Sequence, residues 1–139
     1  MRAMTILAAA AVLVTMTVTG VSYAADMPTD IKTNKVADGK LTVLTDAKGM
    51  TLYTFDMDKT PGKSVCNDKC AQFWAPAMAS SMAKNVGDFT VITRDDGSKQ
   101  WAWKDKPLYG FSKDVKPGDT TGNDVGPNGT HIWHCAVVS

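Results

Sequence analysis

The stretch Tyr109-Gly-Phe111-Ser-Lys-Asp114-Val-Lys-Pro117-Gly118 decides the fold, because the chain contains the same pattern a second time. Fifty-six positions earlier stands Tyr53-Thr-Phe55-Asp-Met-Asp58-Lys-Thr-Pro61-Gly62, in register without a gap. A Y-x-F-x-x-D-x-x-P-G unit that occurs twice indicates two copies of one supersecondary unit. We therefore expect the chain to be built as a tandem repeat.

Alternating apolar and polar residues around both copies are typical of half-buried strands. The predicted strands are residues 41–45, 50–58, 89–94, 99–104, 108–112 and 131–138. An Asn128-Gly129 turn leads into the last of them. All acidic residues are Asp, which suits turns, and none is the helix-favouring Glu. The predicted fold class is therefore all-β: two hairpin-based repeats, about residues 40–84 and 85–139, forming a small sandwich or an open barrel.

One short helix is predicted between the repeats, over residues 67–74. Asn67 or Asp68 can cap its start, because both side chains accept hydrogen bonds from free backbone N–H groups. The helix must end before Pro76, which restricts the residue that precedes it. Residues 78–84 can add a further helical turn.

The cysteines predict one local disulfide. Cys66 and Cys70 flank the start of the predicted helix and can reach bonding distance if Cys66 is not helical. In an exported chain such a pair is oxidised more often than it binds metal, and no second pair follows to complete a zinc ribbon. Cys135 is then either a buried free thiol or the link in a disulfide-bonded dimer.

The beginning of the chain has the features of a signal peptide. Arg2 supplies a positive charge, an apolar stretch runs from Ile6 to Val18, and Ser22-Tyr23-Ala24 offers small residues where signal peptidase reads. We predict cleavage after Ala24, with Ala25/Asp26 as the near alternative. An uncleaved membrane anchor is the competing interpretation, because the apolar stretch approaches spanning length.

The residues after this segment bound the class of protein. Residues 25–39 are polar without a sustained period and are predicted to form a loose N-terminal arm, followed by a single domain over residues 40–139. Without Arg2 the basic and acidic residues balance. Nucleic acid and anionic membranes both require a basic face, so neither is expected as a partner.

The paired motif resembles the secreted-repeat family of bacterial predicted lipoproteins with a Yx(FWY)xxD motif, a family without an agreed biochemical function. The resemblance covers residues 40–138. It implies a cysteine pair in the first repeat followed by an aromatic, here Cys66 and Cys70 followed by Phe73-Trp74. Many relatives are lipid-anchored through a cysteine at the cleavage site. This chain has none there, which implies a soluble periplasmic or secreted form with no stable membrane anchor.

The motif aromatics have two interpretations. Tyr53 with Phe55, and Tyr109 with Phe111, can form paired platforms for a ligand, or they can be the two halves of a core related by an approximate twofold axis. We favour the core, because alternation is what a half-buried sheet requires in any case.

The motif carboxylates are predicted to be structural. Asp58 and Asp114 precede the Pro-Gly pairs at 61–62 and 117–118, and an Asp in this position can accept hydrogen bonds from N–H groups two or three residues on. Calcium is an alternative for the first copy, where Asp56, Asp58 and Thr60 have the spacing of a calcium loop. In the second copy, Lys116 stands where a ligand oxygen would be needed.

The segment His131-Ile-Trp-His134-Cys135 suggests copper or haem, but its geometry is unfavourable. On a strand, His131 and His134 would point to opposite faces, and no C-x-x-C-H motif is present for covalent haem. If a metal binds, His134 is the first candidate ligand, then Cys135, then His131. No cofactor is expected, with copper, haem and calcium as alternatives.

The sequence contains no catalytic constellation that we can identify. It has no Glu, no G-x-S-x-G, no phosphate loop and no recognisable His–Asp pairing. We therefore expect a non-catalytic envelope protein, a binding or structural module whose partner is an envelope component or a small ligand. The alternative is a periplasmic metal-binding or redox-associated protein.

Overall fold

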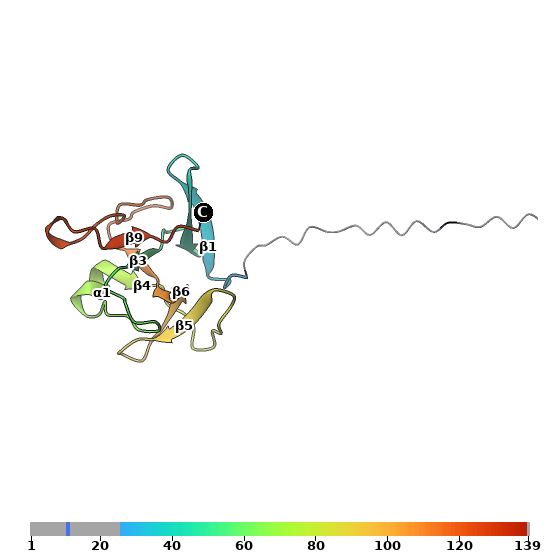
Figure 1. Ribbon diagram of the computed structural model, residues 1–139, viewed down its shortest axis with the longest axis horizontal. Coiled ribbons are helices and arrows are strands. Elements are labelled where there is room, and N and C mark those ends of the chain that lie inside the picture. The colour runs from blue at the N-terminus through green and yellow to red at the C-terminus, as the bar shows by residue number, and fades with distance from the viewer. Residues whose placement is uncertain (1–10, 12–25, 139) are drawn as a thin grey trace, which may run out of the picture.

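The computed structural model describes Ala11 and residues 26–138, so the predicted signal peptide, apart from Ala11, lies outside the described residues. The described chain folds into short antiparallel strands in three sheets, with one short α-helix (Figure 1). The all-β prediction is confirmed, together with the one short helix and the disulfide beside it. The sheets do not form a closed barrel.

The two repeats run through a similar order of elements, with one additional short strand in the second. The first contains β1 (Ile31–Val36), β2 (Leu41–Asp46), β3 (Tyr53–Phe55), α1 (Lys69–Phe73) and β4 (Trp74–Pro76). The second contains β5 (Phe89–Thr93), β6 (Lys99–Trp103), β7 (Lys106–Pro107), β8 (Tyr109–Phe111), the short 3-10 helix η1 (Pro127–Gly129) and β9 (Trp133–Cys135). Each repeat thus begins with a hairpin, continues through the motif strand and ends in a short strand.

The central sheet joins the repeats by exchanging their last strands. Its order is β4-β8-β3-β9, and Tyr53 lies directly opposite Tyr109 at its centre. The motif strand β3 pairs with β9 of the second repeat, and β8 pairs with β4 of the first. The two motif strands therefore meet on an approximate twofold axis, and neither repeat completes its part of the sheet alone.

Equivalent hydrogen bonds attach each hairpin to this sheet. The N–H of Leu44 on β2 donates to the carbonyl of Ala136 at 2.9 Å, and that of Trp101 on β6 donates to Ala77 at 2.8 Å. Beneath them, apolar side chains from both repeats form one core cluster that includes Leu44, Leu52, Phe89, Trp101 and Leu108. Burial of this shared core holds the two hairpins to the central sheet.

The prediction of a loose arm over residues 25–39 was wrong. Residues Ile31–Val36 form β1, which pairs with β2 along its whole length. The sequence does not show the alternation that predicts a strand, because only the two terminal residues, Ile31 and Val36, are buried. Pairing supplied by β2 stabilises a strand that the side-chain pattern alone does not indicate.

Two predicted strands are shorter than expected. Of residues 50–58 only Tyr53–Phe55 form regular strand, and of residues 131–138 only Trp133–Cys135. The expected hairpin between 41–45 and 50–58 is reduced to a single bridge from Thr45 to Thr51. The neighbouring residues still form single backbone hydrogen bonds, from Leu52 N–H to the Leu44 carbonyl and from Ala136 N–H to the Leu52 carbonyl, both at 2.9 Å.

The helix also begins later than predicted. Its five residues start at Lys69, and Asp68 precedes it with a positive φ of 54° and without a side-chain capping bond. The further helical turn over residues 78–84 is absent. Met78 instead forms a bridge with Gln100, which continues the antiparallel pairing beyond β4. No helix among the described residues has the length and apolarity needed to cross a membrane.

Candidate functional site

The motif tyrosines and carboxylates bond across the two repeats. The Tyr53 hydroxyl donates to Asp114 Oδ2 at 2.6 Å, and the Tyr109 hydroxyl donates to Asp58 Oδ2, also at 2.6 Å. Burial and the neighbouring carboxylate raise the pKa of both phenols, so both remain protonated donors. The motif is therefore a reciprocal clamp, in which each copy supplies the acceptor for the tyrosine of the other.

Each aspartate also closes its own Pro-Gly loop. Asp58 Oδ1 accepts the N–H of Val65 at 2.7 Å, and Asp114 Oδ1 accepts the N–H of Thr121 at 3.0 Å. The predicted acceptance from N–H groups two or three residues on was wrong, because the bonded N–H lies seven residues on in both copies. In each aspartate, one carboxylate oxygen therefore binds the N–H of its own loop, and the other binds the tyrosine hydroxyl of the partner repeat.

The clamp of Tyr109 continues into a buried polar network. Ser64 Oγ lies 2.6 Å from the Tyr109 hydroxyl and accepts Arg94 Nη1 at 3.0 Å. The Arg94 guanidinium also donates to Gln100 Oε1 at 2.8 Å and to the carbonyl of Cys66 at 2.7 Å. Every buried polar side-chain atom in the described part of the chain has a partner. Asp58 itself has a raised pKa, chiefly because burial disfavours its charge.

Four aromatic rings form one continuous stack above the clamp. Phe55 lies 4.0 Å from Trp133, Trp133 3.8 Å from Trp74, and Trp74 4.1 Å from Phe111, measured between ring centroids. The two indoles are buried and the two phenyl rings are half-buried. Tyr53 and Tyr109 meet the indoles edge-on from the core side. The motif aromatics therefore have two roles: the tyrosines belong to the buried core, and the phenylalanines are the two outer rings of the stack.

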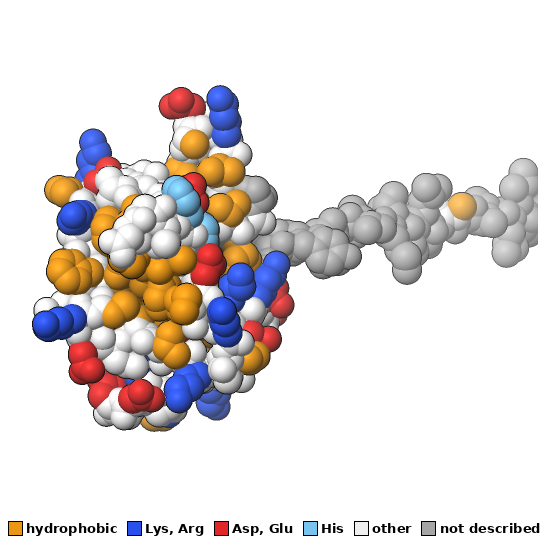
Figure 2. Space-filling model, turned by 60° about the vertical axis from the view of Figure 1, so that its left-hand side comes forward, with side chains coloured by type: hydrophobic (Ala, Val, Ile, Leu, Met, Phe, Trp, Pro, Cys, Tyr) orange, Lys and Arg blue, Asp and Glu red, His pale blue; other side chains and the backbone are white. Residues whose placement is uncertain are grey.

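This stack forms the floor of an apolar groove of about 460 Å³. The walls come from α1 and from the loop before β9, with Phe73, Val125, Pro127 and Ile132 among the lining side chains. Phe73 is 55% exposed, although it is a large aromatic. Figure 2 shows hydrophobic side chains gathered over the centre of the face that carries α1, with charged side chains around them. The volume of the groove falls in the range of small-molecule binding sites.

The predicted disulfide is confirmed and borders this groove. Cys66 is bonded to Cys70, with 5.2 Å between their Cα atoms. Cys70 lines the groove, whereas Cys66 is fully buried beside the clamp. In the second copy the position of Cys66 is taken by Gly122, where a Cβ atom would lie 2.7 Å from the Trp74 ring. The disulfide therefore belongs to the first repeat alone and fixes the helix to the site.

The histidines lie on β9, in the case of His134, and just before it, in the case of His131. Both contact Asp124: His131 Nδ1 lies 2.9 Å from its carbonyl, and His134 Nδ1 lies 3.1 Å from its carboxylate. The expectation that they would point apart was wrong, because His131 precedes the strand. His134 Nε2 contacts Asp56 at 2.9 Å, and these two carboxylates raise the histidine pKa. Asp56 and Asp124 thus bind opposite ring nitrogens and do not converge on one point.

The candidate metal and calcium ligands are mostly engaged by the fold. No group of three or more His, Cys, Asp or Glu side chains among residues 26–138 has the arrangement of a metal site. Asp56 contacts His134, while Asp58 contacts Tyr109, so the two carboxylates of the calcium candidates are engaged by different partners. Cys135 is a half-buried free thiol, and burial raises its pKa to about 11. At neutral pH it remains protonated and poorly nucleophilic.

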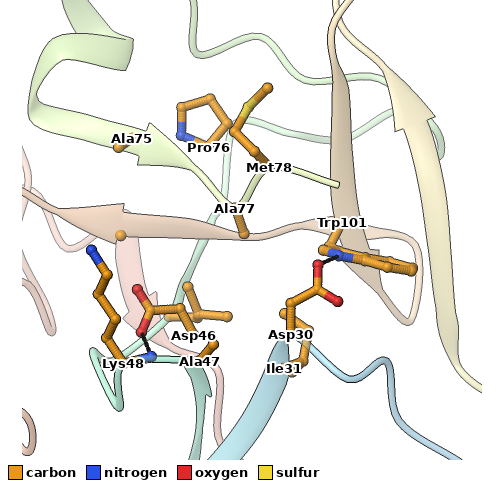
Figure 3. Close-up of a pocket in the computed structure, with 12 residues that line it drawn as sticks. Asp30, Ile31, Asp46, Ala47, Lys48, Ala75, Pro76, Ala77, Met78 and Trp101 are labelled. Atoms are coloured by element: carbon orange, nitrogen blue, oxygen red, sulfur yellow. Dashed lines mark hydrogen bonds between the residues drawn. The ribbon is translucent and has the colours of Figure 1, made fainter. Parts of the chain in front are cut away.

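A further cavity, of about 340 Å³, lies between β1, β2 and the segment around β4 (Figure 3). Two carboxylates line it, and both accept hydrogen bonds from the fold. Asp30 Oδ2 accepts the indole N–H of Trp101 at 3.0 Å, and Asp46 Oδ1 accepts the N–H of Lys48 at 2.9 Å. These carboxylates hold the first hairpin in place, so the aromatic groove is the stronger candidate site.

Sequence reasoning missed the stack and the clamp. It singled out all four motif aromatics, yet Trp74 and Trp133 entered only as a neighbour of the cysteines and as a residue between the histidines. Their separation of fifty-nine positions, close to the motif spacing, was the available signal. Arg94 gave no signal, because a single arginine in a turn-flanking position is usually solvated.

Comparison with known proteins agrees with the internal repeat. Residues 32–78 and 90–136 each match a family described as a secreted repeat of unknown function, and together they cover about two thirds of the chain. Both matched ranges include the hairpin, so the first repeat begins well before the predicted residue 40. No curated protein and no solved structure gave a significant match. The chain belongs to this family of secreted repeats and contains two copies of the repeat, which gives it an extracellular or cell-envelope location.

Proposed function

We propose that this protein is a non-catalytic binding module of the cell envelope, and that its ligand is a small hydrophobic molecule held in the aromatic groove. The observation that carries the proposal is the open apolar groove of about 460 Å³ over the four-ring stack. Large aromatic surfaces are rarely left open without a use, because their burial is favourable.

The arrangement below the groove favours a rigid site. The stacked rings and Cys70 line the groove, and Cys66 packs with the clamp tyrosines in the buried cluster beneath it. A preformed site loses little conformational entropy when its ligand binds, which favours affinity. The motif carboxylates support binding rather than catalysis, since Asp58 and Asp114 accept bonds from tyrosine hydroxyls and backbone N–H groups on both oxygens.

The proposed location is the periplasm or the exterior, after cleavage behind Ala24. Its support is the charged, apolar and small-residue pattern of the first segment, together with the secreted family. Intact mass of the protein isolated from its native envelope tests this. A mass that begins at Ala25 is expected, and a mass that retains the apolar segment would indicate the membrane anchor instead.

The groove is tested with N-phenyl-1-naphthylamine, a neutral apolar dye whose fluorescence rises when it leaves water. We expect saturable binding of one dye per protein. Phe73→Ala should weaken binding by about fivefold, because it removes part of the apolar wall. The control is Met82→Ala, since Met82 is a large exposed hydrophobic outside the groove. Equal binding by both variants, or no saturable binding by the wild type, would refute the proposal.

A further inference from the structure

The charges around the aromatic groove have one sign. Lys69 on α1 and Lys113 after β8 are the charged residues among its lining side chains, and the lining includes no carboxylate. Neither ammonium takes part in a salt bridge within the described part of the chain. The chain as a whole is close to neutral, so this local excess of positive charge is a property of the groove.

The ring stack adds to the same preference. Trp133 has Phe55 on one face and Trp74 on the other, and Trp74 has Trp133 and Phe111. The indoles can therefore present only ring edges to a ligand. An aromatic ring carries partial negative charge on its faces and partial positive charge at its edges. A cation would find none of the ring faces it prefers on the inner rings, and the lining offers no carboxylate to pair with it. An acid group, in contrast, can pair with the two ammonium groups.

On these grounds we infer that the ligand of the groove is a planar hydrophobic acid, a flat apolar body with a carboxylate or a similar acid group. The inference rests on the proposed function and specifies its ligand. The body lies over the stack, where the outer phenyl rings and Phe73 offer apolar surface. The acid group lies at the rim, within reach of Lys69 and Lys113, whose long stems can cover apolar surface while the ammonium stays in water.

The repeat itself suggests the substitution that tests Lys113. Lys113 stands where the first copy of the motif has Met57. Replacing Lys113 by Met therefore gives the second repeat the residue of the first, and it removes the charge while keeping an unbranched side chain. Lys59 is an exposed lysine outside the lining and serves as the matched control.

The test compares three probes with one naphthalene body: 2-naphthoate, naphthalene-2-carboxamide and naphthalen-2-ylmethylammonium, measured by calorimetry. We expect 2-naphthoate to bind about fivefold to tenfold more tightly than the amide, as two exposed charge pairs predict, and the ammonium to bind most weakly. Added salt should weaken only the naphthoate. Lys69→Met/Lys113→Met should reduce the affinity for naphthoate to that for the amide. Lys59→Met should leave the affinities for naphthoate and for the amide unchanged.

The outcomes separate this inference from the proposed function. If the amide binds as tightly as the acid, or if the double lysine variant keeps the difference, the acid preference is overturned and the apolar groove remains. If none of the three probes binds, both the inference and the proposed function fail. The near-ultraviolet circular dichroism of the stacked indoles reports whether each variant retains the groove floor, so lost affinity can be distinguished from lost structure.

Discussion

The two repeats share one motif but surround its tyrosine–aspartate pair differently. Around Asp58 and Tyr109 lie Ser64, Gln100 and the buried guanidinium of Arg94. Around Asp114 and Tyr53 the further donors are the N–H of Gly122, at 3.3 Å from the tyrosine oxygen, and the N–H and hydroxyl of Thr121. One clamp is completed by long side chains from the neighbouring hairpin, the other by the loop backbone.

The difference follows from two positions on the hairpins. Arg94 is equivalent to Val36 of the first repeat, because each begins the turn of its hairpin. In both turns the carbonyl of this residue accepts the N–H of the glycine three residues further on. Gln100 forms a bridge to Met78 as Val43 does to Val137. The first repeat places valines where the second has a cation and an amide. The motif thus defines the tyrosine–aspartate bonds between the repeats, while the hairpin residues decide which neighbouring groups support each bond.

The largest effect is expected where the clamp depends on a buried cation. Arg94→Met should lower the free energy of unfolding by about 3 kcal/mol, because it leaves the carbonyl of Cys66 and the side chains of Ser64 and Gln100 without a donor. Chemical denaturation measures this loss. Arg94→Lys should recover only part of it, since an ammonium lacks the planar fork. A wild-type midpoint for Arg94→Met would mean that the network does not support the clamp.

The two tyrosines allow a matched comparison. Tyr53→Phe should cost about 2–3 kcal/mol and Tyr109→Phe about 1–2 kcal/mol, as expected for hydrogen bonds to a charged acceptor. The first loss is larger because Asp114 is buried, whereas Asp58 is half-buried and lies in the field of Arg94. Denaturation of both variants under identical conditions checks the order. Equal losses would show that the support from the hairpin does not matter.

The disulfide is an asymmetry of the first repeat, and its removal should cost less stability than Arg94→Met or Tyr53→Phe. Cys66→Ala/Cys70→Ala should lower stability by about 2 kcal/mol, since the bond closes only a short loop. The groove should lose dye affinity as well, because Cys70 lines it. Cys135→Ser is the control for loss of a thiol. An unchanged affinity with lowered stability would mean that the disulfide holds the fold without shaping the groove.

The smallest effect concerns His134, which stands where the first repeat has Ala75. Asp56 and Asp124 raise its pKa, so the folded state holds the proton more tightly than the unfolded state. The resulting stabilisation is complete below the unfolded pKa of about 6.5. It is lost as the pH rises through the higher pKa of the folded state. Because the groups are exposed, it should stay below about 1 kcal/mol.

His134→Ala should therefore flatten the pH dependence of stability between the unfolded pKa of about 6.5 and the higher pKa of the folded state. Titration of the imidazole by NMR checks the direction of the pKa shift. A histidine pKa at or below its ordinary value would contradict the ion pairs. The same variant tests the copper prediction. If Cu(II) or Cu(I) binds with a stoichiometry near one, the ion must displace a carboxylate from one of the His134 ring nitrogens. His134→Ala should then weaken copper binding sharply.

The sequence by itself determined the repeat, the strand-rich class and the disulfide. These features are local: motif spacing, turn residues and a pair of cysteines four positions apart can be read without knowing what lies beside them. The β5–β6 hairpin, predicted from residues 89–94 and 99–104, likewise needs only its own alternation and turn. Asp58 and Asp114 were found as candidates for the same reason.

Only the tertiary structure decided what those residues contact. Tyr53 and Asp114 are far apart in the chain and meet because the repeats exchange their last strands. That exchange brings Trp74 beside Trp133 and builds the groove, and it buries Arg94 against a loop of the other repeat. A local pattern specifies which face of a strand is apolar, but not which distant strand covers it, because pairing is chosen by the burial that the whole fold achieves.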